Sequence, residues 1–158
     1  MELIMKGAIL GAIATIVLDL WAIVAKQVLN ITPPSWPMVG RWLGHMRHGQ
    51  FIHRPISDSA PVDGEAVLGW TFHYLIGVAY GIAYLAILSV YFEGQISLMA
   101  ALILAWVLLI APWCVLQPGL GAGLFARKAP NPNLMRAGSI IGHSVFGLGL
   151  YLGAKLIV

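Results

Sequence analysis

Long apolar stretches separated by polar ones dominate the pattern along this chain. Four of them, residues 3–28, 65–91, 97–116 and 136–158, are apolar over most of their length. Each is long enough to cross a hydrocarbon core of about 30 Å, which requires roughly 20 helical residues. Lipid cannot hydrogen-bond to an open backbone, so such segments are expected to be helices. The pattern therefore predicts a single all-α transmembrane domain, a polytopic protein whose four helices form an antiparallel bundle.

The connections between these helices differ in length. Residues 30–64 form a long first loop, in which Ser-Trp-Pro at Ser35 is typical of a helix start with proline in the first turn. Apolar residues follow at helical spacing, which predicts a short amphipathic helix in the membrane interface. Residues 117–135 form a second loop rich in glycine and proline, and residues 92–96 form a tight turn. The polar side of the amphipathic helix is expected to carry Arg41, His45 and His48.

Composition supports a lipid environment. Hydrophobic residues make up 59% of the chain and charged residues 9%, whereas a typical soluble domain is about 25% charged. So few charges could not cover a soluble protein of this size. The chain also lacks a basic tract interleaved with aromatic residues, which argues against nucleic acid as a partner. The lipid bilayer is the partner that the composition predicts.

The placement of the nine Lys and Arg residues predicts an orientation. Lys6 and Lys155 lie on the side of the two termini, and the others lie on the side of the two long loops. Cytoplasmic loops of membrane proteins carry an excess of basic residues. The long loops are therefore predicted to be cytoplasmic and both termini to lie outside. The residues on the loop side are Lys26, Arg41, Arg47, Arg54, Arg127, Lys128 and Arg136.

Small residues recur at intervals of four in the predicted helices. This spacing lets the backbones of neighbouring membrane helices approach closely. The glycines are therefore predicted to pack helices against one another. The pairs are Gly7 and Gly11, Gly77 and Gly81, Gly138 and Gly142, and Gly149 and Gly153.

A polar cluster is predicted inside the bundle. Asp19, His73 and His143 each share a helix face with residues such as glycine at intervals of four. At about 1.5 Å per residue, all three lie roughly 10–14 Å from the long-loop end of their helices. An ionisable group inside the membrane costs on the order of 2.5–3.5 kcal/mol by insertion scales, so such groups are candidates for a functional site. Gln117, Tyr80 and Trp106 are expected to complete the cluster.

Three roles remain open for this cluster. The first is binding or transport of a small ligand or proton, with Asp19 exchanging a proton and the histidines relaying it. The second is a redox subunit, in which His73 and His143 ligate haem b, or in which both histidines and Asp19 bind a transition metal such as zinc or iron. The third is a structural accessory subunit of a larger membrane complex, in which Asp19 only fixes the helix register. A transporter of this size is expected to form a homo-oligomer.

Two loop sites are weaker candidates. The glycines of the second loop, followed by Arg127 and Lys128, could bind an anion or a lipid headgroup through backbone N–H groups, although a turn that requires positive φ is the favoured interpretation. The first loop could hold a metal at the surface, although a solvated interfacial face is favoured there. The residues concerned are Gly119, Gly121, Gly123, Arg127 and Lys128 in the second loop, and His45, His48 and His53 in the first.

Enzyme signatures are missing from the sequence. It contains neither G-x-S-x-G nor H-E-x-x-H, and no nucleophile has an adjacent base. These absences favour a protein that is not an enzyme.

Several motifs resemble those of a family of small bacterial four-helix inner-membrane proteins that is catalogued as a domain of unknown function. The resemblance implies a bacterial inner-membrane location and four helices, and it supplies no activity. The motifs are Met38-Val39-Gly40-Arg41-Trp42, Leu68-Gly69-Trp70 with His73, Gln117-Pro118-Gly119-x-Gly121-Ala122-Gly123, Pro130-Asn131-Pro132, and His143-x-x-Phe146-Gly147-Leu148-Gly149-Leu150-Tyr151.

Overall fold

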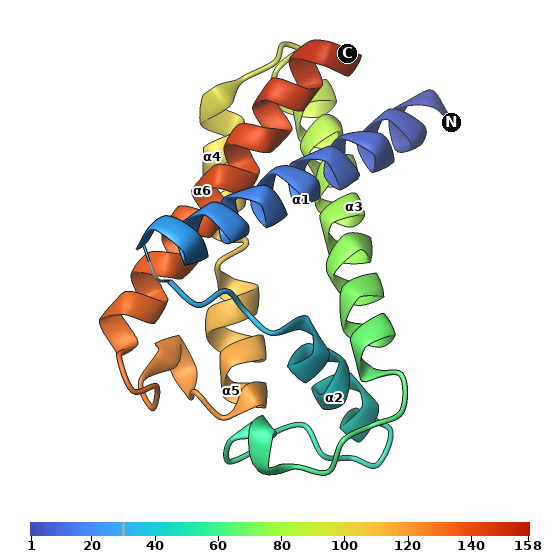
Figure 1. Ribbon diagram of the computed structural model, residues 1–158. Coiled ribbons are helices and arrows are strands. Elements are labelled where there is room, and N and C mark those ends of the chain that lie inside the picture. The colour runs from blue at the N-terminus through green and yellow to red at the C-terminus, as the bar shows by residue number, and fades with distance from the viewer. Residues whose placement is uncertain (30) are drawn as a thin grey trace. The chain divides into compact units, whose positions relative to one another are not determined.

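The computed structural model is helical, with no strand in the part of the chain that it describes (Figure 1). That part comprises residues 1–29 and 31–158, so Asn30, the first residue of the predicted long loop, lies outside the described residues. The elements are α1 (Glu2–Leu29), α2 (Trp36–Met46), η1 (Ile56–Asp58), α3 (Glu65–Tyr91), α4 (Leu98–Val107), η2 (Pro112–Leu116), α5 (Gln117–Leu120), η3 (Leu124–Ala126) and α6 (Pro132–Ile157).

Four helical stretches are long and apolar enough to cross a membrane. They are Glu2–Val28, Glu65–Tyr91, Leu98–Leu120 and Pro132–Ile157. The all-α fold with four membrane-spanning helices is therefore confirmed.

Two helix ends differ from the approximate boundaries predicted for the spans. The third span continues to Leu120, four residues further than predicted, and Pro118 lies in the first turn of α5, the last helical segment of this span. The fourth helix begins at Pro132, four residues earlier than predicted. There the side chain of Asn131 accepts a hydrogen bond from the backbone N–H of Leu134 at 3.3 Å, which caps the helix.

The helices group into two compact units, each with its own core. Unit 1 comprises Met1–Pro33, Tyr74–Leu108 and Ile140–Val158, and unit 2 comprises Pro34–His73 and Leu109–Ser139.

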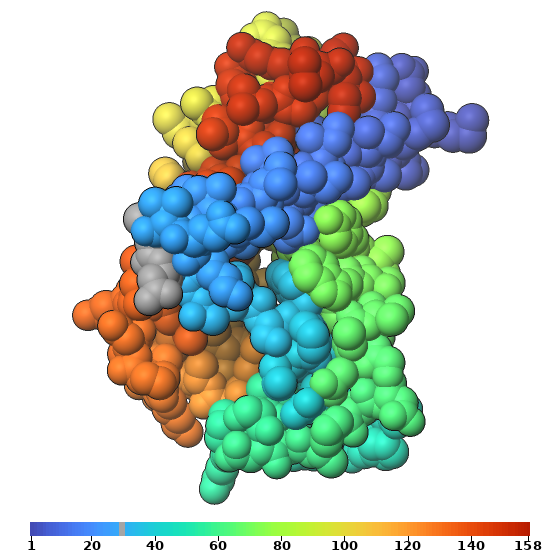
Figure 2. All heavy atoms as spheres, in the orientation of Figure 1, coloured from blue at the N-terminus to red at the C-terminus, as the bar shows by residue number. Residues whose placement is uncertain are grey.

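The core of unit 1 is formed by α1, α4 and the C-terminal parts of α3 and α6. Its buried residues are Leu10, Ala14, Tyr84, Leu85, Leu88, Ala100, Ala101, Phe146, Leu150 and Ala154. A shallow groove at one end is lined by Glu2, Gly94 and Val158 among others, so both termini lie beside the turn between α3 and α4. The space-filling view shows α1 directly against the C-terminal part of α6 (Figure 2).

Glycines allow the backbones of unit 1 to approach closely. A Cβ atom added at Gly11 would lie 2.7 Å from the Cα atom of Val78, and one added at Gly81 would lie 2.5 Å from the Cα atom of Gly11. One added at Gly149 would lie 3.0 Å from the Cα atom of Ala14. The packing role predicted for these glycines is confirmed.

The prediction that Gly138 and Gly142 pack helices together was wrong. A Cβ atom at Gly138 would meet no atom of the described residues within 4 Å, and one at Gly142 would make only an ordinary contact with Leu18 at 3.6 Å. A spacing of four residues places two glycines on one helix face, but it does not determine whether another helix covers that face.

Unit 2 is built around α2 and the N-terminal turns of α3. Val39, Trp42 and Ile56 form its buried core. Gly40 and Gly69 let the two helices touch, because a Cβ atom at Gly40 would lie 2.7 Å from the backbone nitrogen of Gly69. The helix predicted in the first loop is confirmed at Trp36–Met46.

Candidate functional site

Asp19 accepts a hydrogen bond inside unit 1. The hydroxyl group of Tyr74, from α3, donates to its Oδ2 atom at 2.9 Å. Asp19 is partly buried and lies ten residues before the end of α1, which is about 15 Å along the helix axis. The first span therefore carries a carboxyl group deep in its apolar length, tied to a neighbouring helix.

Tyr80 and Trp106, the aromatic residues predicted around Asp19, and the neighbouring Tyr84 of α3 have separate surroundings in unit 1. Tyr84 is fully buried and donates to the carbonyl oxygen of Ser97 at 2.9 Å. Tyr80 packs edge-on against Phe146, with ring centroids 6.2 Å apart. Trp106 is 46% exposed on the surface and donates to the hydroxyl oxygen of Ser144 at 3.0 Å. Of these rings, Tyr84 lies in the core and Trp106 lies outside it.

His73 is buried among aromatic rings in unit 2. Its ring stacks on that of Trp36, with centroids 3.8 Å apart and planes 19° from parallel, and it meets the ring of Trp70 at 5.8 Å. The stacked indole covers one face of the imidazole. Asp19 and a partly buried His143 belong to unit 1, so the convergence of the three ionisable groups stays a prediction.

Neither metal hypothesis gains support from the described residues. No three His, Cys, Asp or Glu side chains among them are placed to hold a metal ion. The haem hypothesis likewise gains no supporting contact in either unit.

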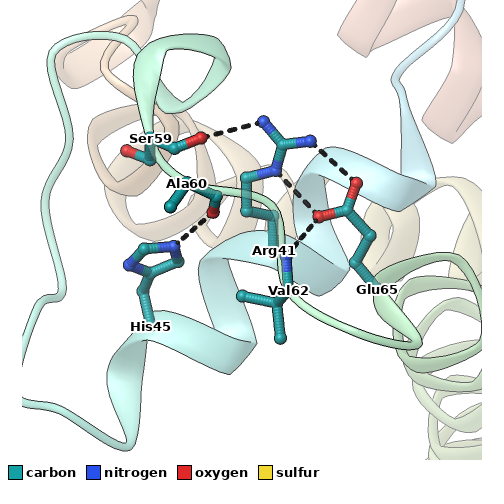
Figure 3. A network of polar contacts seen from close by, with 6 residues as sticks. All are labelled: Arg41, His45, Ser59, Ala60, Val62 and Glu65. Carbon is teal, nitrogen blue, oxygen red and sulfur yellow. Dashed lines mark hydrogen bonds and ion pairs between the residues drawn. The ribbon is translucent and has the colours of Figure 1, made fainter.

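The prediction that Arg41 lies on the polar face of α2 was wrong, because the Arg41 side chain is buried (Figure 3). Its Nε and Nη2 atoms donate to the two carboxylate oxygens of Glu65, both at 2.8 Å, and Nη1 donates to the carbonyl oxygen of Ser59 at 3.1 Å. Glu65 also accepts from the backbone N–H of Val62 at 3.0 Å. The hydrogen bonds to Glu65 raise the pKa of Arg41 above its usual value. This two-pronged ion pair ties α2 to the start of α3.

The three histidines of the first loop each bond a different group, although the rings of His45 and His53 also pack edge-on with centroids 5.2 Å apart. His45 bonds the carbonyl oxygen of Ala60 at 2.9 Å (Figure 3), and the exposed His48 accepts from Arg47 at 3.1 Å. The expectation that His53 is solvated was wrong, because its side chain is buried. Its Nδ1 atom donates to the carbonyl oxygen of Gly119 at 3.1 Å. That bond anchors the loop to α5.

The glycines of the second loop build a turn. Gly121 and Gly123 have φ values of 97° and 74°, which confirms the favoured interpretation. The N–H groups of Ala122 and Lys128 donate within the loop, both at 2.8 Å, so the loop uses these amides internally. Gly119 instead lies in α5, where an added Cβ atom would meet the indole of Trp42. Nothing in the described residues tests the predicted anion site.

Two residues were missed by the sequence reasoning. Tyr74 could have been found because a buried tyrosine hydroxyl in an apolar span needs an acceptor, and Asp19 offers one. Glu65 could have been found because a carboxylate at the start of α3 follows a loop that contains several arginines. The sequence pattern does not indicate which of these arginines pairs with Glu65.

Comparison with known proteins identifies the family. No curated protein and no solved structure matches the chain. A family profile matches residues 8–157, nearly the whole chain. The resemblance drawn from the motifs is therefore confirmed, and the chain belongs to the family described as protein of unknown function (DUF2938).

Proposed function

We propose that this multi-pass membrane protein binds and releases a proton at Asp19, and that this exchange accompanies the binding or passage of a small solute. The observation that carries the proposal is the hydrogen bond from Tyr74 to Asp19 at 2.9 Å. Ionisable groups in spans are rare because they are costly, and they mark ion pathways and proton relays.

The chemistry of this bond allows proton exchange. An ionised carboxylate accepts a hydrogen bond from the tyrosine hydroxyl, and a protonated carboxyl group still accepts one through its carbonyl oxygen. Tyr74 therefore holds Asp19 in both protonation states. A proton can enter or leave without breaking the contact between α1 and α3.

The test compares wild-type protein with Asp19→Asn. Asparagine keeps an oxygen acceptor for Tyr74 but cannot ionise. Infrared difference spectra of protein in liposomes, recorded while the pH is changed, should show the carbonyl band of a titrating carboxyl group in the wild type. The band should vanish in Asp19→Asn, while the unfolding temperature stays close to that of the wild type.

Two readouts separate a proton site from a structural contact. Dicyclohexylcarbodiimide, which modifies protonated carboxyl groups in apolar surroundings, should label Asp19 and spare the exposed Asp58 of the loop. Proteoliposomes that contain a pH-sensitive dye should show slower proton movement with Asp19→Asn. Identical spectra, labelling and proton movement in both proteins would overturn the proposal.

A further inference from the structure

The third span is irregular where it enters unit 2. Pro112 has no N–H group to donate and disturbs the helical ladder. The backbone N–H of Gln117 bonds the carbonyl oxygen of Pro112, five residues earlier, so η2 (Pro112–Leu116) is a π-helical turn. Such turns are rare and occur frequently at functional sites. The site to consider is formed by Trp113 of η2 and Gln117, the first residue of α5, which lie four residues apart.

Gln117 holds a buried polar atom without a partner. Its side chain is 7% exposed, and no group in the described residues hydrogen-bonds to its Oε1 atom. Its Nε2 atom lies 3.4 Å from the hydroxyl oxygen of Ser139, which itself donates to the carbonyl oxygen of Met135 at 2.9 Å. Because that hydroxyl proton is committed to Met135, Ser139 accepts from the Gln117 nitrogen. This fixes the orientation of the amide and makes the unpartnered atom an acceptor.

Trp113 presents a complementary group. Its indole Nε1 atom, which can only donate, is also buried without a partner in the described residues. The Trp113 ring packs against that of Phe125, with centroids 5.4 Å apart. Arg136 of α6 donates to the carbonyl oxygen of Phe125 at 2.7 Å. Trp113 and Gln117 therefore both face the segment that leads from η3 into the start of α6.

We infer that Trp113 and Gln117 together bind a small neutral molecule through a hydroxyl group. A hydroxyl oxygen can accept from Trp113 while its proton is donated to the oxygen of Gln117. A neutral occupant fits because the two unpartnered groups, an indole N–H and an amide oxygen, are themselves uncharged. Leaving both buried groups without hydrogen bonds would be unfavourable, because each would have lost its contact with water without gaining a partner. The site belongs to unit 2 and does not depend on proton exchange at Asp19.

The test follows the indole N–H signal of Trp113 by NMR, in full-length protein labelled with ¹⁵N-tryptophan in detergent micelles. The signal is identified by its loss in Trp113→Phe. The probes are ethanol and its isomer dimethyl ether, which accepts hydrogen bonds but has no hydroxyl proton. Ethanol should shift the signal saturably, and the ether should produce a shift several-fold smaller. In Gln117→Met the ethanol shift should fall several-fold, whereas shifts caused by the detergent should remain.

The occupant can be solvent or solute, and the same spectra distinguish them. A cross-peak between the Trp113 indole proton and a long-lived water, unchanged by ethanol and lost in Gln117→Met, would identify water as the bound hydroxyl compound. A saturable ethanol shift would identify a site for hydroxylic solutes. Both outcomes support the inference. If the wild type shows neither signal, or if Gln117→Met folds and shows both undiminished, the inference is overturned.

Discussion

The ion pair between Arg41 and Glu65 shows how single residues stabilise unit 2. Both side chains are largely buried, with 9% and 18% of their surface exposed, and the guanidinium is bonded to both carboxylate oxygens. A charge left alone in such a place loses its solvation without gaining a partner. Loss of either member should therefore destabilise the fold. This cost comes from the charge left without a partner, and it does not measure the stability of the ion pair relative to an apolar contact.

We expect Glu65→Gln to lower the free energy of unfolding by about 1–2 kcal/mol, because the amide leaves the Arg41 charge without a counter-charge. The amide oxygen can still accept one hydrogen bond, so the loss is smaller than for Glu65→Ala. Thermal unfolding of purified protein in detergent, followed by circular dichroism, measures the change.

The matched control for this prediction is Glu93→Gln. Glu93 is exposed in the turn between α3 and α4, so the same chemical change there should leave the unfolding temperature within error of the wild type. Equal stability of Glu65→Gln and the wild type would show that the ion pair contributes nothing to the fold.

At the scale of elements, the helices of unit 1 are held at distances that only glycine permits. A Cβ atom at Gly81 would meet the carbonyl oxygen of Gly7 and the backbone of Gly11. These are main-chain atoms of α1, so no rotation of a side chain can relieve the clash. Gly81→Ala therefore requires α1 and α3 to move apart.

We expect Gly81→Ala to destabilise the protein by about 1–3 kcal/mol, as over-packing of a tight contact does. Gly138→Ala is the control within the same chain, because its added methyl group meets no described atom within 4 Å. Alanine is also the better helix former, so Gly138→Ala should be neutral or stabilise by up to about 1 kcal/mol. Similar unfolding temperatures for the two variants would contradict the glycine contact.

Hydropathy predicted the four spans well, but it predicted the residues at which they begin and end less well. Apolar length located all four spans, because a helix in lipid must be apolar over most of its length. The third span was cut short at Leu116 because Gln117 and Pro118 resemble a loop by composition. In the structure Gln117 is the first residue of α5 and is buried, and Pro118 lies in the first turn of that helix. Composition does not reveal that a polar residue has a buried environment.

The candidate site was predictable only in part. A carboxylate in an apolar span identifies Asp19 as unusual, whatever the fold. The identity of its hydrogen-bond partner depends on how α1 crosses α3, which the sequence does not encode locally. Depth and the glycine-bearing helix faces predicted His73 and His143 as neighbours of Asp19. They did not identify Tyr74, the residue that bonds Asp19 within unit 1.

At the scale of the whole molecule, the distribution of Lys and Arg residues predicts the orientation of the protein in the membrane. Both termini lie beside the turn between α3 and α4 in unit 1, and the basic residues are concentrated in the two long loops. An excess of Lys and Arg marks the cytoplasmic side. Whether the protein forms a homo-oligomer or joins a larger complex stays a prediction.

We expect the first loop to be cytoplasmic and the turn at Gln95 to face the opposite side, because moving the basic loops across the membrane opposes the rule for positive charges. The measurement uses Cys114→Ala, which removes the single native cysteine, with one new cysteine at the exposed Ser57 or Gln95. A membrane-impermeant maleimide added to intact bacterial cells should label Gln95→Cys, and Ser57→Cys should react only after the membrane is permeabilised. Labelling of Ser57→Cys in intact cells, with Gln95→Cys protected, would reverse the orientation and show that the loop charges do not set it.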